Sequence, residues 1–289
     1  MVDVVFAGST CQALAKEVAD ESQAELGALA IKRFPDGELY LRVESDVKGK
    51  SCAVLQSTCR PQDSNIVELL ILLENLKELG AEKVVTVVPY YGYSRQDQVF
   101  REGEAVSARV FAKHVSMHSD EFYTINIHEK NILKYFDIPA HDLDADKTLG
   151  EYFKTYEFED PVVIGPDEGA EGLAMGIAKV LECDPDCLQK MRIRPGEVEM
   201  KPKSLDVEGK DVFLVDDMID SGGTMAEAIR MLLSQNARNV LVGSVHPVLT
   251  GNVVSRLFSA GAVDVVATNT IPTDISFITV SGIIASALV

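Results

Sequence analysis

The clearest chemical signal in this chain is a pair of carboxylates followed by small residues. Asp216 and Asp217 follow the apolar run Val212–Val215. Shortly after them comes a segment with little side-chain bulk: Asp220, Ser221, Gly222, Gly223 and Thr224. Small side chains let the backbone curl until several N–H groups and the start of a helix point at one anion. Because the carboxylates can accept hydrogen bonds from nearby hydroxyls, the stretch predicts a site for a 5-phosphorylated ribose.

A solvated turn is the simpler interpretation of this stretch, but turns rarely combine an apolar strand, paired carboxylates, small residues and a helix start. The chain lacks both the G-x-x-x-x-G-K-[ST] and the G-x-G-x-x-G patterns, which argues against a P-loop NTPase or a dinucleotide enzyme. The stretch resembles the signature shared by type I phosphoribosyltransferases and ribose-phosphate pyrophosphokinases, where it holds the ribose phosphate. That resemblance indicates the ligand and leaves the reaction open.

Five further stretches carry groups suited to nucleotide chemistry: Phe34 to Glu38, Arg95 to Asp97, Asn126 to His128, Gly165 to Gly169 and Lys190 to Arg192. Together with the small-residue loop, they resemble the ribose-phosphate pyrophosphokinase family in their order and over nearly the whole chain. The run Gln98 to Glu104 looks more like archaeal members than bacterial ones. A phosphoribosyltransferase would not supply the first three stretches.

Two of these stretches are expected to bind ATP. An aromatic ring beside carboxylates, as in Phe34 to Glu38, can stack on adenine while the acidic groups accept its protons. A guanidinium such as that of Arg95 can stack on adenine or bind phosphate. A plain turn and a solvated loop are the competing interpretations of the two stretches. With the resemblance, the predicted ATP-binding residues are Phe34, Asp36, Gly37, Glu38, Arg95, Gln96, Asp97 and His128.

His128 and Asp167 are the predicted metal ligands. Each follows a predicted strand, and a carboxylate such as Asp167 suits Mg²⁺, which prefers oxygen and keeps several waters. On chemistry alone a single histidine is more often structural. The resemblance implies instead that both residues stand on the Mg²⁺ and triphosphate side of the site, with Mg²⁺ as the cofactor.

Lys190 and Arg192 are the predicted catalytic residues. They lie in a charged stretch punctuated by Pro195 and Gly196, which is typical of a mobile loop. Two cations at positions i and i+2 of an extended segment point the same way and could close over a phosphoryl group. A solvated surface run explains the spacing equally well. The resemblance implies that both are catalytic and that Arg192 also contacts ribose 5-phosphate, with Arg194 as a rival.

The elements that must position these residues alternate between strands and helices, which predicts an α/β fold. The expected strands are Val4 to Ala7, Ala53 to Gln56, Lys83 to Val88, Phe122 to Ile127, Pro161 to Ile164, Lys210 to Val215, Asn239 to Val245 and Val263 to Ala267. The expected helices are Asn65 to Leu79, Glu171 to Leu181, Met225 to Ser234 and Val253 to Phe258. Because the pattern restarts, we expect two similar domains with parallel sheets flanked by helices, like type I phosphoribosyltransferases.

The polar segment His141 to Asp146 is the expected joint between the domains. An N-terminal domain of residues 1–142 would serve the ATP side and assembly, and a C-terminal domain of residues 143–277 would carry the ribose 5-phosphate loop. The tail, residues 278–289, is expected to pack on the first domain.

Composition narrows the class of protein further. The formal net charge of −18 disfavours nucleic acid as a partner, since such binding needs basic side chains. The same acid excess leads to the hypothesis of a salt-rich cytoplasm, which activity and folding without added salt would contradict. The five cysteines suggest reduced, ordinary thiols, and the lack of a membrane-length apolar run or a signal pattern predicts a cytoplasmic protein with no membrane partner.

The resemblance implies that ATP and ribose 5-phosphate give 5-phosphoribosyl 1-diphosphate and AMP, for nucleotide biosynthesis, in a homo-oligomer whose subunits share the ATP site. A type I phosphoribosyltransferase and a noncatalytic regulatory homologue are the alternatives, and the latter would be expected to lose Lys190 or Arg192. Some positions depart from the family pattern: Gly165, Ala170 and Asn126 stand where Ser, Gly and Asp are frequent. The short tail after Pro272 puts phosphate activation and ADP inhibition in doubt.

Overall fold

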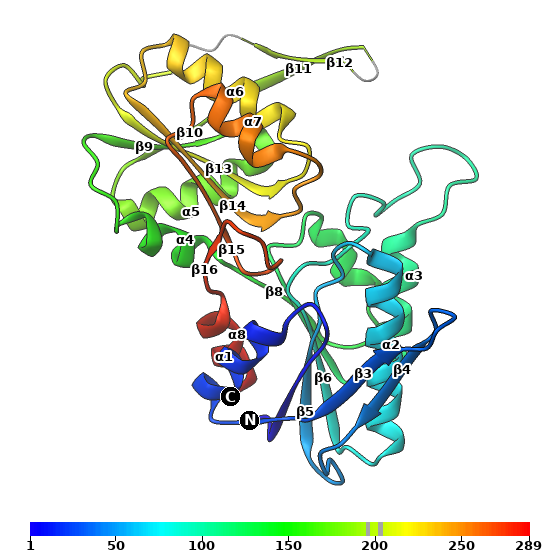
Figure 1. Ribbon diagram of the computed structural model, residues 1–289. Helices are drawn as coiled ribbons and strands as arrows, with labels where there is room; N and C mark the ends of the chain where they lie inside the picture. Colours follow the sequence, from blue (N-terminus) through cyan, green and yellow to red (C-terminus); the bar gives the residue numbers. More distant parts are fainter. Residues whose placement is uncertain (195–196, 202–204) are drawn as a thin grey trace. The chain divides into compact units, whose positions relative to one another are not determined.

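The computed structural model describes residues 1–194, 197–201 and 205–289, with side chains described outside residues 189–204. The chain divides into two compact units. The first comprises Met1–Asp144, Thr270–Pro272 and Thr279–Val289, and the second comprises Ala145–Asn269 and Thr273–Ile278. Each unit has a six-stranded parallel sheet with helices on both faces, so the predicted fold class is confirmed (Figure 1).

The first unit is built on the sheet order β2-β1-β5-β6-β7-β8, in which every neighbouring pair is parallel. Helices α2 and α3 cover one face of this sheet, and α1 and α8 cover the other (Figure 1). The elements are β1 Val4–Ala7, α1 Gln12–Ser22, β2 Glu25–Leu26, β3 Leu29–Arg33, β4 Leu39–Val43, β5 Ser51–Leu55, α2 Gln62–Glu78, β6 Lys83–Val88, α3 Ser107–His118, β7 Glu121–Ile125, the 3-10 helix η1 Lys130–Tyr135, β8 Ala140–Leu143 and α8 Ser281–Leu288.

Helix α2 shows why the first unit packs as it does. Leu69, Leu72, Leu73 and Leu76 repeat at helical spacing, and each is at most 1% exposed in the core formed with the sheet. Burying a leucine side chain stabilises the fold by roughly 1.5–3 kcal/mol. This apolar stripe fixes the helix, so that its first turn lies at the carboxyl end of β5.

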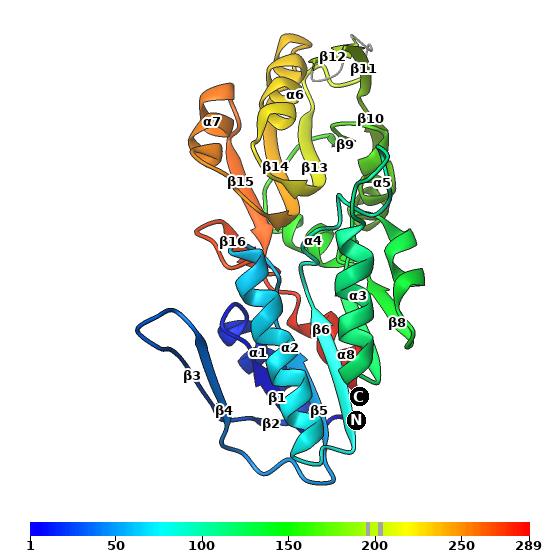
Figure 2. The same ribbon diagram turned by 90° about the vertical axis from the view of Figure 1, so that its right-hand side faces the viewer.

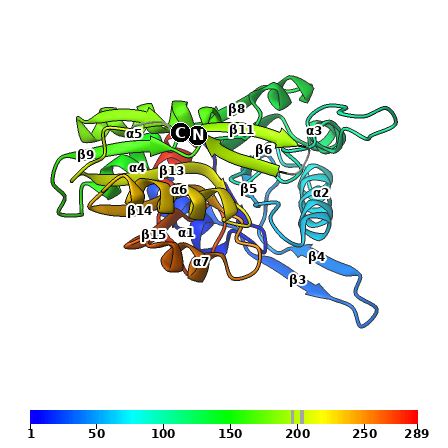
Figure 3. The ribbon, with the colours of Figure 1, turned by 90° about the horizontal axis from the view of Figure 1, so that it is seen from above.

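Strands β3 and β4 form a separate antiparallel ribbon that carries the predicted ATP-binding loop at its tip. The Phe34 amide donates to the Glu38 carbonyl at 2.9 Å and closes the turn. Gly37 has a φ of 96°, a conformation that favours glycine. Figures 2 and 3 show the ribbon projecting beyond the sheet of its unit.

The second unit has the sheet order β10-β9-β13-β14-β15-β16, again with parallel neighbours throughout. Helices α6 and α7 cover one face and α4 and α5 the other (Figure 2). The elements are α4 Asp146–Phe153, β9 Pro161–Gly165, the 3-10 helix η2 Glu168–Ala170, α5 Glu171–Leu181, β10 Asp184–Cys187, β11 Gln189–Arg194, β12 Glu197–Lys201, β13 Asp211–Ile219, α6 Gly223–Ser234, β14 Asn239–Pro247, α7 Val253–Ala260, β15 Asp264–Thr268 and β16 Ser276–Ile278.

The two units repeat one topology. In each, the first strand pairs with the second across a connecting helix, an antiparallel ribbon follows, and the next strand returns to pair with the first. The ribbon is β3–β4 in the first unit and β11–β12 in the second. Each unit therefore inserts its ribbon at the same point of the same fold.

Several elements differ in their bounds from the sequence prediction. Strand β13 runs to Ile219 instead of Val215, because Met218 and Ile219 are buried and pair with the end of β14. Strand β7 ends at Ile125 because Asn126 adopts a left-handed φ of 39°. The division between the two units, at Asp144 and Ala145, falls within the expected joint His141 to Asp146, although the first part of that segment belongs to edge strand β8 and its last residue starts α4.

The stretch containing Lys190 and Arg192 was expected as a loop, and this too is corrected. It forms β11, which pairs antiparallel with β12, with Lys190 opposite Met200 and Arg192 opposite Val198. Pro195 and Gly196, which the sequence analysis noted in this stretch, lie outside the described residues.

The tail of the chain belongs to the first unit, where α8 packs against α1. The Val2 amide donates to the Leu288 carbonyl at 3.1 Å, which brings the two ends of the chain together (Figure 1). Within the described ranges, no helix combines the length and apolar character needed to cross a membrane.

Candidate active site

The predicted phosphate loop connects the end of β13 to the start of α6. Gly222 has a φ of 68°, and a Cβ built on it would lie 2.6 Å from the Val253 Cγ1 atom. Both facts require glycine at this position. Helix α6 is held by Met225, Ile229 and Leu232, which are buried in the core, so its N-terminus stays at the carboxyl edge of the sheet. Peptide N–H groups at such a helix start suit a phosphate group.

The paired carboxylates lie within β13, two residues before its end. Asp216 and Asp217 are both partly exposed. Because successive side chains of a strand point to opposite faces, the two carboxylates leave the strand on opposite sides. The Asp216 Oδ1 atom accepts from the Asp217 amide at 2.9 Å. The two carboxylates therefore present their oxygens on the two sides of the strand, near its end.

Asp167 lies at the same edge of the sheet. It follows β9, whose Ile164 pairs with Leu214 of the neighbouring β13. The Asp167 Oδ1 atom accepts from the Gly169 amide at 2.9 Å and caps the short helix η2. The structure thus brings Asp167, the paired carboxylates and the phosphate loop to one edge of the second unit.

The ribbon with Lys190 and Arg192 starts at this edge as well. The Leu188 amide donates to the Gly165 carbonyl at 2.9 Å, and β11 begins one residue later. The side chains of Lys190 and Arg192 lie outside the described residues, so only their backbone is placed.

Gly165 and Ala170, two positions that the sequence analysis singled out, lie against each other. A Cβ built on Gly165 would lie 3.1 Å from the Ala170 Cβ atom and 3.2 Å from the Asp167 carbonyl oxygen. A side chain at position 165 would therefore crowd the methyl group at position 170. The glycine and the alanine fit each other at the base of the Asp167 turn.

In the first unit, Arg95 to Asp97 follow β6 and His128 follows β7, and these two strands are parallel neighbours. Arg95 and His128 are exposed, whereas Asp97 is 7% exposed. The Asp97 carbonyl accepts from the Tyr135 hydroxyl at 2.8 Å, and the Gln96 amide donates to the Tyr93 carbonyl at 2.9 Å. These bonds fix the backbone of the turn that presents Arg95.

The turn before His128 is held by a residue that the sequence analysis did not select. The side chain of Asp142, which is 11% exposed, accepts from the Ile127 amide at 2.8 Å, and the Asn126 amide donates to the Leu143 carbonyl at 2.9 Å. Burial raises the pKa of Asp142 to about 6, against the lowering effects of the Ile127 bond and of Lys130. No residue spacing in the sequence links Asp142 to His128.

The tip of the β3–β4 ribbon is exposed from Phe34 through Glu38. The Phe34 ring is 44% exposed and packs edge to face on Tyr40 at 5.8 Å between centroids. Arg33 Nη1 donates to the Gly37 carbonyl at 2.8 Å, and Asp36 Oδ1 accepts from the Glu38 amide at 3.1 Å. The turn is therefore internally bonded while its aromatic ring faces solvent.

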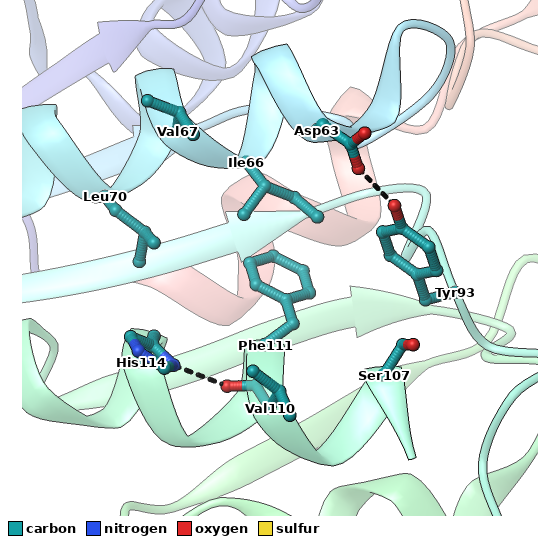
Figure 4. A pocket seen from close by; sticks show the side chains of 9 residues that line it. All are labelled: Asp63, Ile66, Val67, Leu70, Tyr93, Ser107, Val110, Phe111 and His114. Atoms are coloured by element: carbon teal, nitrogen blue, oxygen red, sulfur yellow. Dashed lines mark hydrogen bonds between the residues drawn. The ribbon is translucent and has the colours of Figure 1, made fainter. Parts of the chain in front are cut away.

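Two hollows lie along helix α2. A hollow of about 530 Å³ beside the ribbon is lined partly by Gly37 and Glu38. A second, of about 380 Å³, lies between α2 and α3 (Figure 4). Apolar side chains such as Ile66 and Phe111 dominate the second hollow, and a hydrogen bond joins Tyr93 to Asp63 at one end. Its lining offers little to a triphosphate, so it does not fit the predicted ATP contacts.

The residues present fit a magnesium ion that is carried largely by substrate. Among the side chains that the structure describes, those of residues 1–188 and 205–289, no group of three or more His, Cys, Asp or Glu is arranged to hold a metal. Mg²⁺ commonly binds one or two protein carboxylates together with substrate phosphates and waters, and Asp167 suits that role. His128 belongs to the first unit and Asp167 to the second, and each is described within its own unit.

Thr250 and Arg256 contact the phosphate loop and were also missed. Thr250 Oγ1 donates to Asp220 Oδ1 at 2.9 Å, and Arg256 Nη1 donates to the Ser221 carbonyl at 2.6 Å. Both follow β14, about thirty residues after the loop. The one available signal is that β14 neighbours β13 in a parallel sheet, so the turns after the two strands share an edge.

Comparison with known proteins gives a consistent family. Residues 4–118 match the N-terminal domain of ribose phosphate pyrophosphokinase, and residues 131–278 match the phosphoribosyl transferase domain. Ribose-phosphate pyrophosphokinases of Methanopyrus kandleri and Methanosarcina acetivorans are each 44% identical to the chain, and each match covers at least 98% of both chains.

The fold of the chain is also similar to that of a solved structure. The crystal structure of phosphoribosylpyrophosphate synthetase from Mycobacterium smegmatis superposes with a TM-score of 0.87 at 31% identity, covering 99% of this chain and 97% of that one. The predicted resemblance, including its archaeal character, is confirmed by these matches. With the domain models spanning most of its length and archaeal relatives matched end to end, the chain belongs to the ribose-phosphate pyrophosphokinase family.

Proposed function

We propose that this protein is an enzyme that transfers the diphosphate group of ATP to the anomeric hydroxyl of ribose 5-phosphate. The hydroxyl oxygen bonds to the β-phosphorus, the bond from that phosphorus to the bridging oxygen of the α-phosphate breaks, and the hydroxyl proton is lost to solvent. The products are 5-phosphoribosyl 1-diphosphate and AMP. Family membership supports this reaction, and the phosphate loop after β13 is the structural observation that carries it.

The sugar would lie at the carboxyl edge of the second sheet. Backbone N–H groups of Asp220 to Thr224 and the start of α6 would bind the 5-phosphate, since the left-handed Gly222 within this segment turns the backbone into the helix. Asp216 and Asp217 would accept hydrogen bonds from the ribose hydroxyls. The Asp220 carboxylate would support the loop through its hydrogen bond from Thr250 and would not contact the phosphate, because a carboxylate and a phosphate repel each other.

ATP would be bound by the first unit and by the ribbon tip of a second subunit. Arg95 and Gln96 would contact the nucleotide, with Asp97 holding the turn. Phe34, Asp36, Gly37 and Glu38 are exposed at the end of a projecting ribbon, and such a tip can reach a neighbouring molecule. A homo-oligomer with a shared ATP site and a cytoplasmic location are parts of the proposal that rest on the family resemblance.

Catalysis would consist mainly of positioning and charge neutralisation. Phosphoryl transfer spreads negative charge over nonbridging oxygens and needs little covalent help from the protein. Lys190 and Arg192 would stabilise that charge, and Arg192 would also meet the sugar phosphate. Asp167 and His128 would hold Mg²⁺, which when bound offsets the charge of the triphosphate.

One assay tests the reaction directly. The pure protein is incubated with ATP, Mg²⁺ and ribose 5-phosphate, and the nucleotide products are separated. We expect AMP without ADP, together with 5-phosphoribosyl 1-diphosphate. Release of ADP would indicate an ordinary kinase or ATPase, and turnover only with 5-phosphoribosyl 1-diphosphate and a nucleobase would indicate a phosphoribosyltransferase. Either result would overturn the proposal.

A further inference from the structure

A segment of the second unit that follows β14 is hydrogen-bonded to the phosphate loop near both of its ends. The Leu249 amide donates to the Ile219 carbonyl at 2.9 Å, and the Thr250 amide donates to the Asp220 carbonyl at 3.0 Å. Arg256 Nη1 donates to the next carbonyl, that of Ser221, at 2.6 Å. We call residues 249–256 the brace. The brace donates a hydrogen bond to each of three successive carbonyl groups, those of Ile219, Asp220 and Ser221.

These bonds set the direction of the loop's donors. In a planar trans peptide, the C=O and N–H groups point in opposite directions. When the carbonyls of Ile219, Asp220 and Ser221 face the brace, the amides of the following residues, Asp220, Ser221 and Gly222, face away from it. Successive N–H groups directed to one side form a concave site for an anion.

The brace also affects the electrostatics of the loop, through Thr250 and Arg256. The Asp220 carboxylate is turned toward the brace by its bond from Thr250 Oγ1. Arg256 adds a permanent positive charge beside a loop that follows Asp216 and Asp217 closely. A phosphate dianion bound next to these carboxylates would be repelled by them, and a nearby guanidinium offsets part of that repulsion.

We propose that Arg256 is a positioning residue for the ribose 5-phosphate site, acting through its hydrogen bond to the Ser221 carbonyl. That bond holds the Ser221–Gly222 peptide so that the Gly222 N–H points to the phosphate side, at the position where glycine is required by Val253. The inference rests on the proposed function of this loop. Arg256 touches no reacting atom in this scheme and takes no part in transferring the diphosphate.

The test compares two Arg256 variants by steady-state kinetics and by calorimetric titration with ribose 5-phosphate. Arg256→Met removes both the donor and the charge, and we expect its KM and Kd for ribose 5-phosphate to rise about ten- to a hundredfold. The kcat at saturating sugar and the KM for ATP should stay within about twofold, because the group acts on phosphate binding alone. Arg256→Lys keeps the charge and should show an intermediate loss of affinity.

Arg230→Met is the matched control, since Arg230 is an exposed arginine on α6 of the same unit. Its affinity for ribose 5-phosphate should equal that of the wild type. An Arg256→Met variant that is folded by circular dichroism and binds the sugar with wild-type affinity would overturn the inference. Should that variant fail to fold, wild-type affinity in Arg256→Lys would overturn it equally, because lysine cannot reproduce the guanidinium geometry.

Binding and turnover separate the two hypotheses. If the wild type binds ribose 5-phosphate and loses affinity on Arg256→Met but forms no AMP, the positioning role stands and the proposed reaction falls. If the wild type forms AMP and the variant keeps its sugar affinity and KM, the reaction stands and the role of Arg256 falls.

Discussion

Gly222 lies so close to Val253 that a Cβ on the glycine would be 2.6 Å from the valine Cγ1 atom. With its φ of 68°, Gly222 is constrained by both its backbone and its neighbour. Gly222→Ala should shift the loop and weaken ribose 5-phosphate binding at least about tenfold, since strain of about 1–2 kcal/mol comes from the left-handed backbone alone. Calorimetric titration with ribose 5-phosphate measures the effect.

Gly209→Ala provides the control for that experiment. Gly209 lies in the same unit with a φ of 73°, but a Cβ built on it meets no atom within 4 Å. It shares the backbone cost without the collision, so the variant should be somewhat less stable and bind the sugar normally. Equal sugar affinity in the two variants would remove the argument from close packing at Gly222.

Lys190→Ala tests the catalytic pair. If Lys190 stabilises the transferring diphosphate only in the transition state, the substitution should lower kcat and kcat/KM together, by about a hundredfold or more, and leave ribose 5-phosphate affinity nearly unchanged. Steady-state kinetics with both substrates, alongside calorimetry, gives these values. A kcat equal to that of the wild type would refute the role.

Arg238 and Asp211 form a partly buried pair that should govern the acid stability of the second unit. Arg238 Nε and Nη2 donate to the two Asp211 oxygens at 2.9 and 2.7 Å. Burial raises the pKa of Asp211, but hydrogen bonds from Arg238, the Glu159 amide and Asn239 lower it by more, and the pKa ends below its usual value. Such a carboxylate stabilises the fold above its ordinary pKa, and this stability is lost as the pH falls.

Arg238→Met should therefore lower the Tm at pH 7 and make it less sensitive to acid than that of the wild type. Thermal unfolding followed by circular dichroism between pH 3 and pH 7 measures both effects. Parallel Tm curves for the two proteins over this range would show that the pair does not set the acid response.

The sequence predicted the fold well where one segment carries its own signal. The strands Val4–Ala7 and Lys83–Val88 and the helix Glu171–Leu181 have the predicted bounds, because their apolar periodicity matches the element that they form. The left-handed glycine in the phosphate loop was also foreseeable, since the run of small residues is local.

The remaining features depend on neighbours in space. Strand β13 continues through Asp216 and Asp217 because β14 is long enough to pair with it, which the polar residues themselves do not indicate. Strand β8 is polar and short, yet it forms because β7 offers an edge. Arg256 is thirty-five residues from the carbonyl that it holds, and no periodicity connects such positions.

Asp142 gives a prediction with the opposite pH dependence. Its side chain is 11% exposed and accepts from the Ile127 amide, and Lys130 and Asp144 are the charged groups that affect it. Burial raises its pKa from 3.8 to about 6, so the folded state binds this proton more tightly than the unfolded chain. The stabilisation is complete below pH 4 and is lost as the pH rises through about 6, by at most about 3 kcal/mol.

Asp142→Asn removes this titration while keeping an oxygen that can accept from the Ile127 amide. The unfolding free energy of the variant, relative to that of the wild type, should increase from pH 4.5 to pH 8. Urea unfolding at these two pH values measures the change. Asp137→Asn, at an exposed position in the same unit, is the control and should show no such change. An equal difference in unfolding free energy between Asp142→Asn and the wild type at both pH values would show that the Asp142 carboxyl does not titrate in this range. The pKa would then not be raised by burial beside the His128 turn.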